Sequence, residues 1–204
     1  MPLAPAKSLL DHLLLGVAKL EEGIAWVENK TGVKAAFGGS HPGAGTHNAL
    51  LSLGDRQYLE IIAIDPMQVE APGLLFPELK DLSEPRLIAW AVAVENLIET
   101  ARRARAQNID TIGPLAGSRA QADGTVLAWQ TLRISGPKAE GLPFFIEWQK
   151  GTAHPSQYSP AGCILASFVV EHTDIEWMRR TLMGLGVDAN VAPSPVGVRL
   201  KARL

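Results

Sequence analysis

Three side chains that could bind a metal or transfer a proton lie within otherwise apolar stretches of the 204-residue sequence. They are His12 in LLDHLLLG, Glu60 in YLEIIAI and Glu147 in FFIEWQ. A buried carboxylate needs a cation or hydrogen-bond donors to offset its desolvation. One imidazole with two carboxylates suits a divalent ion such as Mn, Fe, Ni or Zn, and leaves positions open for water or substrate. The alternative interpretation is a hydrogen-bonded core histidine with glutamates neutralised by an arginine, for which Arg133 is a candidate.

A helix and three further strands are expected after the strand that carries His12. Alternation of side chains places His12, Leu14 and Gly16 on one face of that strand. The apolar spacing from Leu20 onward predicts an amphipathic helix that ends near Gly32. We then expect a short strand at 34–37, a glycine-rich wide hairpin connection, GGSHPGAGTHN, and strands at 47–53 and 57–64.

The same order of elements recurs twice along the chain. The positions eight residues before each predicted helix are His12, Ala89 and Ser167, which are 77 and 78 residues apart and indicate an internal repeat. The second unit has a strand at 86–94, a helix at 97–106, a loop at 113–124 and strands at 126–134 and 144–149. The truncated third unit has a strand at 164–170, a helix at 175–185 and strands at 187–191 and 196–200. The expected organisation is a first module at 1–66, a linker at 67–85, a second module at 86–151 and a third unit at 161–204, packed as one compact protein.

The composition excludes several classes of partner. The formal net charge is -2 and no run of lysine or arginine exceeds two residues, so neither nucleic acid nor an anionic membrane surface is expected to bind. The apolar stretches are far shorter than the roughly 20 residues of a membrane span, and the N-terminus lacks the pattern of a signal peptide. A single cysteine rules out an internal disulfide. We expect a cytoplasmic protein with a small-molecule substrate.

The segments LLDHLLLGVAKLEEGIAWV and FGGSHPGAGTHNALLSLGDRQYLEIIAIDP resemble the vicinal oxygen chelate superfamily, which comprises glyoxalases, bleomycin-resistance proteins and extradiol dioxygenases, and within it the glyoxalase-like domain branch. The resemblance implies an α+β fold in which paired βαβββ modules form a cupped, incomplete barrel around a divalent metal, followed here by a truncated βαββ unit. It implies His12, Glu60 and Glu147 as metal ligands, since the first and last strands of each module carry the ligands in such families. The fourth ligand position falls on Ala89, which has no donor atom, and His47 could supply a nitrogen instead.

A substrate pocket is expected over the concave face of this cup. Small side chains on the first strand of the second module predict open space there, unless large side chains such as Phe145 fill it. His41 lies in the glycine-rich connection, which could act as a lid. His154 lies in a polar loop and is expected at the surface. The candidate pocket residues are therefore Ala89, Ala91, His41, Arg133 and Trp129, the last of which could equally belong to the core.

Two functions follow from these expectations. The first is a metal-dependent isomerase, lyase or dioxygenase in which the metal polarises a small oxygen-rich molecule and Glu60 or Glu147 acts as general base. The second is a metal-free protein that sequesters a small molecule, as bleomycin-resistance proteins do, which the missing donor at Ala89 favours. In either case the truncated third unit could mediate a homodimer.

Overall fold

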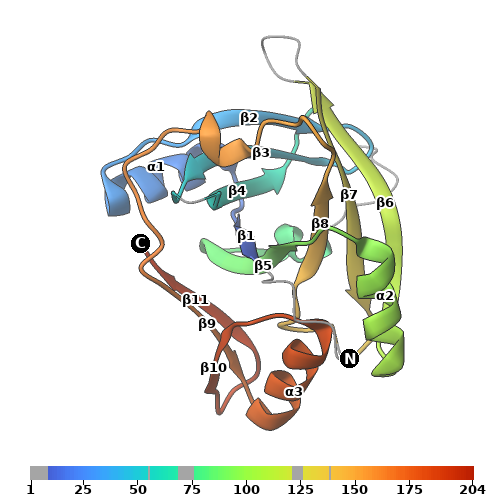
Figure 1. Cartoon of the computed structure of the whole chain (residues 1–204). Coiled ribbons are helices and arrows are strands. Elements are labelled where there is room, and N and C mark those ends of the chain that lie inside the picture. Colours follow the sequence, from blue (N-terminus) through green and yellow to red (C-terminus); the bar gives the residue numbers. More distant parts are fainter. Residues whose placement is uncertain (1–8, 55, 69–75, 121–125, 138) are drawn as a thin grey trace.

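The computed structural model describes residues 9–54, 56–68, 76–120, 126–137 and 139–204. Its main feature is an eight-stranded sheet in the order β2-β3-β4-β1-β5-β8-β7-β6, which curls into the open cup seen in Figure 1. A separate three-stranded sheet, in the order β10-β9-β11, lies beside it together with α3. The expected α+β architecture of paired βαβββ modules with a small third unit is confirmed.

The first module follows the predicted order of elements. Its helix ends where Gly32 adopts a left-handed conformation with φ 74°, and the Gly32 backbone N–H donates to the carbonyl of Glu28. Glycine suits this position because it adopts positive φ without a Cβ clash. The elements are β1 (Leu9–Gly16), α1 (Leu20–Thr31), β2 (Ala36–His41), β3 (Thr46–Ser52) and β4 (Tyr58–Ile64).

The second and third units repeat the strand–helix–strand order. A one-turn helix, η1 (Pro77–Asp81), precedes the second module, and another, η2 (Pro155–Gln157), connects it to the third unit. The second module contains β5 (Arg86–Ala93), α2 (Leu97–Ala106), β6 (Asp110–Ala120), β7 (Val126–Ser135) and β8 (Phe144–Trp148). The third unit contains β9 (Ser167–His172), α3 (Ile175–Leu185), β10 (Asn190–Pro193) and β11 (Arg199–Arg203).

The two modules join through their first strands. β1 pairs in parallel with β4 and antiparallel with β5, and His12 lies opposite Tyr58 on one side and Ala91 on the other. Alternate residues of the sheet face the convex side, where fully buried Trp90 and Phe145 belong to the main hydrophobic core. The intervening residues of each strand face the concave side, so the alternation of side chains decides which of them can reach the cup.

Two expected loops are strands in the structure. β2 continues through Gly38 and Gly39 as far as His41, so the glycine-rich segment forms a short turn after an irregular strand instead of a wide connection. β6 runs through Gly113 and Pro114 and pairs with β7 over the first part of the loop predicted at 113–124. An edge strand tolerates proline because no neighbour is needed on its outer side. The remainder of that predicted loop, and 69–75 of the predicted linker, lie outside the described residues.

The third unit also differs slightly from expectation. Each of its three strands starts three residues later than predicted, at Ser167, Asn190 and Arg199. Among the helices of the described chain, none has the length and apolar character needed to cross a membrane.

Candidate functional site

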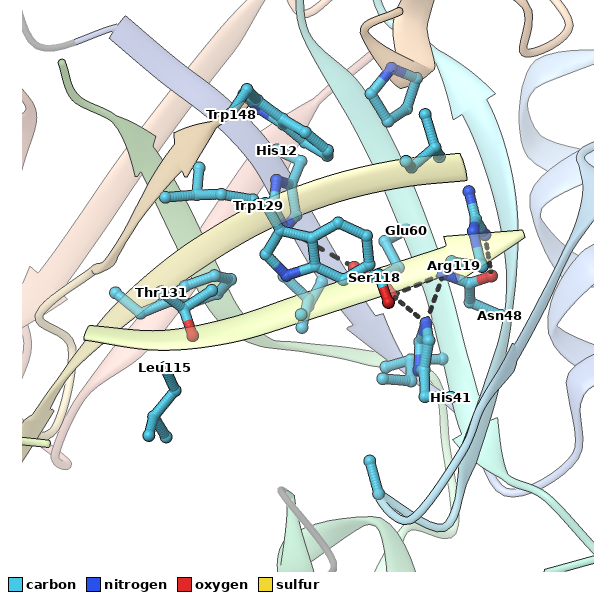
Figure 2. A pocket seen from close by; sticks show the side chains of 18 of the residues that line it. His12, His41, Asn48, Glu60, Leu115, Ser118, Arg119, Trp129, Thr131 and Trp148 are labelled. Carbon is cyan, nitrogen blue, oxygen red and sulfur yellow. Dashed lines mark hydrogen bonds and ion pairs between the residues drawn. The ribbon is translucent and has the colours of Figure 1, made fainter. Parts of the chain in front are cut away.

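The concave face of the sheet encloses a cavity of about 490 Å³. Side chains from both modules line it, and Figure 2 shows how they converge from facing strands of the cup. Its polar wall includes His12 from β1, His41 from β2, Asn48 from β3, Glu60 from β4 and Arg119 from β6. Its apolar wall comes largely from Tyr58, Phe76, Leu115, Trp129, Phe144 and Trp148.

Asp11 and His12 form a buried pair at one end of this polar wall. Their side chains meet although they are consecutive residues, because the pairing of β1 with β5 shifts register between Leu10 and His12. The Nδ1 of His12 lies 2.6 Å from Oδ1 of Asp11, and the two side chains are only 3% and 1% exposed. The ring of Tyr58 stacks on His12 with the ring centroids 4.4 Å apart. The carboxylate of Asp11 and the ring of Tyr58 therefore hold the imidazole of His12 in one orientation.

Asp11 receives two more hydrogen bonds from the second half of the chain. Trp148 Nε1 donates to its Oδ2 at 2.9 Å, and His154 Nε2 lies 3.1 Å from the same oxygen. Burial alone would raise the pKa of Asp11, but the hydrogen bonds from His12 and His154 outweigh it and hold the pKa well below its ordinary value. Asp11 is therefore a buried anion that fixes the proton on Nδ1 of His12 and leaves Nε2 directed toward the cavity.

Glu60 lies at the centre of the polar wall, 8% exposed. Asn48 Nδ2 donates to its Oε1 at 2.7 Å, while His12 Nε2 lies 3.6 Å from Oε2 and His41 Nε2 lies 3.8 Å from Oε1. The Nδ1 of His41 meets Thr46 Oγ1 at 2.8 Å. Burial lowers the pKa of His41, partly offset by the charge of Glu60, so its ring is neutral near pH 7.

Two arginines bring positive charge to the cavity. Arg119, 7% exposed, donates from Nη1 to Oδ1 of Asn48 at 2.9 Å and from Nη2 to the hydroxyl of Tyr158 at 3.4 Å. The guanidinium of Arg133 lies over the ring of Phe76, 4.4 Å from its centroid. Burial lowers the pKa of Arg133, but an arginine remains charged at any physiological pH. The cavity is thus suited to a small molecule that carries negative charge and an apolar part.

Only part of the predicted metal site comes together. His12 and Glu60 meet in the cup as expected, but Glu147 accepts a hydrogen bond from the backbone N–H of Leu97 at 3.0 Å, at the start of α2 on the other side of β8. His47 likewise leaves the cup, and its ring contacts that of Phe37 while the neighbouring Asn48 faces Glu60. The structure therefore places both side chains on the face opposite the cup, since consecutive residues of a strand point to opposite faces.

The structure places the predicted pocket residues in two different surroundings. His41, Arg133 and Trp129 line the cavity. Ala91 is fully buried, and Ala89 packs against a second hydrophobic cluster that includes Leu14, Ile62, Phe76 and Phe144. Phe76 and Phe144 lie on this side of the sheet, in the same cluster as Ala89, whereas Phe145 belongs to the opposite core.

Four important residues were not found from the sequence: Asp11, Asn48, Arg119 and His154. Asp11 lies next to His12 in an apolar strand, and a carboxylate buried in such a strand needs hydrogen-bond donors. This pattern is the signal that could have identified Asp11. His154 was expected at the surface, but it is 1% exposed and its capping contacts within η2 direct its ring at Asp11. Arg119 fell inside a predicted loop, so nothing in the local sequence placed it at the cup.

The side chains in the cup do not fit a divalent metal as they are arranged. Within the described ranges, no group of three or more His, Cys, Asp or Glu side chains is placed to hold a metal ion. On the cavity wall, His12 and His41 lie on either side of Glu60, with nitrogen-to-oxygen distances of 3.6 and 3.8 Å. However, Glu60 Oε1 and His41 Nε2 both face the amide nitrogen of Asn48, at 2.7 and 3.2 Å, and that nitrogen carries donor hydrogens. A cation between these two side chains would have to displace the amide.

Residues 10–186 match the model of the glyoxalase-like domain. The chain belongs to this family, and with it to the vicinal oxygen chelate superfamily. No curated protein matches the sequence.

Several solved structures share the fold. A hypothetical protein from Staphylococcus aureus is similar with a TM-score of 0.72 and 14% identity, over 93% of this chain and 87% of that one. A hypothetical protein from Bacillus halodurans C-125 has a TM-score of 0.50 and 17% identity, over 72% and 99%. A variant methylmalonyl-CoA epimerase from Streptomyces coelicolor, in complex with 2-nitronate-propionyl-CoA, has a TM-score of 0.50 and 12% identity, over 72% and 99%.

Proposed function

We propose that this protein is an enzyme that moves a proton on a small oxygen-rich anion, with Glu60 as the general base. The observation that carries the proposal is the position of the Glu60 carboxylate at the wall of the cavity. One of its oxygens is held by Asn48 at 2.7 Å, and the other faces the Nε2 of His12 at 3.6 Å. A base must be oriented and close to both its substrate and a partner that can exchange protons with it.

Glu60, His12 and Asp11 each have a different role in the reaction. Glu60 Oε2 takes the proton from a carbon next to a carbonyl group, and the electron pair of the broken C–H bond moves onto the carbonyl oxygen. His12 Nε2 exchanges the proton with Glu60 after a closure of several tenths of an ångström, since hydrogen bonds of this kind are often long before a ligand is bound. Asp11 stabilises the charge on His12 during this exchange. The net result is an isomerisation, because a proton, either the one removed or one exchanged with solvent through His12, is added back to the enolate on another face or at another atom of the same molecule.

The charge and shape of the cavity support the substrate class. Arg119 and Arg133 supply two positive charges, which offset the negative charge of an acid group and of an enolate that forms on proton removal. The aromatic wall formed by Trp129, Phe144 and Trp148 suits an apolar substituent. A small carboxylic acid or thioester with a carbonyl group and a short apolar side chain meets both requirements.

Incorporation of deuterium tests this proposal without knowledge of the natural substrate. The protein is incubated in D₂O with a panel of 2-oxo acids, 1,3-dicarbonyl acids and methylmalonyl-CoA, the last because an epimerase that acts on it shares the fold. We expect exchange at the carbon next to the carbonyl for at least one compound, and a fall of about 10²- to 10⁴-fold for Glu60→Gln. Equal exchange by the wild type and Glu60→Gln across the whole panel would refute the proposal.

A metal-free binding protein is the second candidate function. The aromatic lining of the cavity favours it, since stacked and edge-on aromatic side chains can hold a ligand without any chemistry. In that case panel compounds bind to the wild type, measured by calorimetry, while no deuterium is incorporated. Substitution of His12 by alanine then leaves the dissociation constant nearly unchanged, whereas proton transfer requires His12.

A further inference from the structure

The two edge strands of the open cup are bridged by one side chain. β2 and β6 are the outermost strands of the eight-stranded sheet, and they approach each other where the cup almost closes (Figure 1). Arg119 extends from β6 past Gly38 and Gly39 of β2 and reaches Asn48 on β3. Figure 2 shows the bond between the Arg119 and Asn48 side chains. The bond from Nη1 to Oδ1 is 2.9 Å long and joins the second module to the first.

Two adjacent glycines make room for this crossing. A Cβ atom on Gly38 would lie 2.5 Å from Arg119 Nη1 and 2.3 Å from Asn48 Oδ1, both far inside the contact limit. A Cβ atom on Gly39 would lie 3.0 Å from Arg119 Cδ, and Gly39 has a φ of 140°, which disfavours other residues. The pairing of β2 with β3 is irregular at this point. The guanidinium therefore lies against bare backbone, where any side chain would displace it.

The guanidinium decides which way the Asn48 amide faces. An arginine can only donate, so Arg119 requires the oxygen of Asn48 and turns its nitrogen to the other side. That nitrogen has two hydrogens, and it lies 2.7 Å from Glu60 Oε1 and 3.2 Å from His41 Nε2, both acceptors. If the amide were reversed, its oxygen would face the carboxylate and its nitrogen would face the guanidinium. Neither contact would be favourable, so Arg119 selects one orientation.

We infer that Arg119 is a positioning residue that holds the Asn48 amide toward Glu60, in the space that Gly38 provides. Because the amide then occupies Oε1 of Glu60, Oε2 is left as the oxygen for proton transfer. We call Arg119, Asn48 and Glu60 the guanidinium–amide–carboxylate line. The inference rests on the proposed function for its catalytic meaning, but the line itself is open to measurement without a substrate. Because Arg119 and Glu60 come from different modules, the base is oriented only when the two edges of the cup meet.

The side-chain amide of Asn48 reports on this line directly. In the full-length protein labelled with ¹⁵N-asparagine, its two N–H signals are identified by their loss in Asn48→Asp. We expect solvent exchange of these protons to be about tenfold faster in Arg119→Met, since a hydrogen bond to a charged group is lost. Gly38→Ala should have the same effect. The double variant should be no faster than either single variant, because both changes break one interaction. Arg119→Lys should restore part of the protection.

Controls keep the result independent of folding and of the proposed activity. Arg105→Met removes an exposed arginine of α2 and should leave the Asn48 signals unchanged. Backbone spectra establish whether each variant is folded. If Arg119→Met does not fold, Gly38→Ala is the variant that tests the inference. Asn48 protection that is the same in folded Arg119→Met, or in folded Gly38→Ala, overturns the inference even if deuterium incorporation is seen. Loss of protection in these variants supports the line, and a wild type that then incorporates no deuterium counts against the proposed function alone.

Discussion

Replacing Asp11 by asparagine tests whether the buried carboxylate organises the site. The change keeps the shape of the side chain and removes its charge. Asp11 has two oxygens for three donors, namely His12 Nδ1, Trp148 Nε1 and His154 Nε2. An asparagine has one oxygen and one NH₂ group, so either His12 gives up its Nδ1 proton or one donor faces another donor.

The magnitude follows from this mismatch. A buried polar group left without its partner costs about 1–3 kcal/mol. Removing one member of a buried charged pair costs about 3–5 kcal/mol, because the other member stays buried. Asp11, His12 and His154 are each no more than 3% exposed, so water cannot replace the lost contacts. We expect Asp11→Asn to lower the free energy of unfolding by about 3–5 kcal/mol at pH 7.

The effect should also depend on pH in a defined direction. The pKa of Asp11 is lower in the folded protein than its unfolded value of about 4. A lowered folded-state pKa means that the stabilisation is complete above about pH 4 and is lost progressively as the pH falls below it. The difference between wild type and Asp11→Asn should therefore be constant from pH 7 to about pH 5 and become smaller in more acid solution.

Urea unfolding followed by tryptophan fluorescence and circular dichroism measures both effects. Glu99→Gln is the matched control, since that carboxylate also has a lowered pKa, about 2, through hydrogen bonds from Arg102 and Arg103. Glu99 lies at the surface of α2, where solvent screens its ion pairs, and its removal should cost far less than removal of Asp11. A cost for Asp11→Asn no larger than for Glu99→Gln, or one that grows in acid, would refute the reasoning.

Three further predictions follow from the structure. Glu147→Gln should lower stability by about 0.5–2 kcal/mol, since it weakens the bond to the Leu97 N–H at the start of α2, and should leave deuterium incorporation unchanged; a loss of activity in the folded variant would contradict the assignment. Phe145→Ala should cost about 3–5 kcal/mol in urea unfolding because the ring is fully buried in the convex core, and a cost below 1 kcal/mol would contradict that packing. Addition of Mn, Ni, Zn or Fe after chelator treatment should leave the unfolding temperature unchanged, whereas a site filled at 100 times its Kd would add about 2.7 kcal/mol.

The sequence predicted the helices better than the sheet. Leu97–Ala106 and Ile175–Leu185 are found with their expected bounds, because helical periodicity and the capping residues Asn96 and Asp174 act locally. β6 was missed, because pairing with β7 outweighs the local preference of Gly113 and Pro114 for a loop. Strand formation depends on neighbours that are distant in the sequence, which explains the difference.

The site shows the same division between local and distant information. His12 and Glu60 both line the cavity, and their strands begin where the apolar pattern of the sequence begins. Glu147 and His47 were placed on the wrong face, because a shift of one residue reverses the side-chain direction, and both faces of these strands are largely apolar. His154 could not be found, since its partner Asp11 is 143 positions away.

The segment around η2 affects how the chain can be divided. It leaves β8 at Trp148, crosses over the first module and then descends to β9, as the orange trace in Figure 1 shows. On the way it delivers His154 to Asp11, and the carbonyl of Pro160 accepts a hydrogen bond from the N–H of Ser52 at 2.9 Å. A shortened protein that ends with the last strand of the second module would lack the lid over its own buried anion. A two-module fragment that retains the site must therefore extend through Pro160, so the segment that links the third unit to the cup is itself part of the wall of the candidate site.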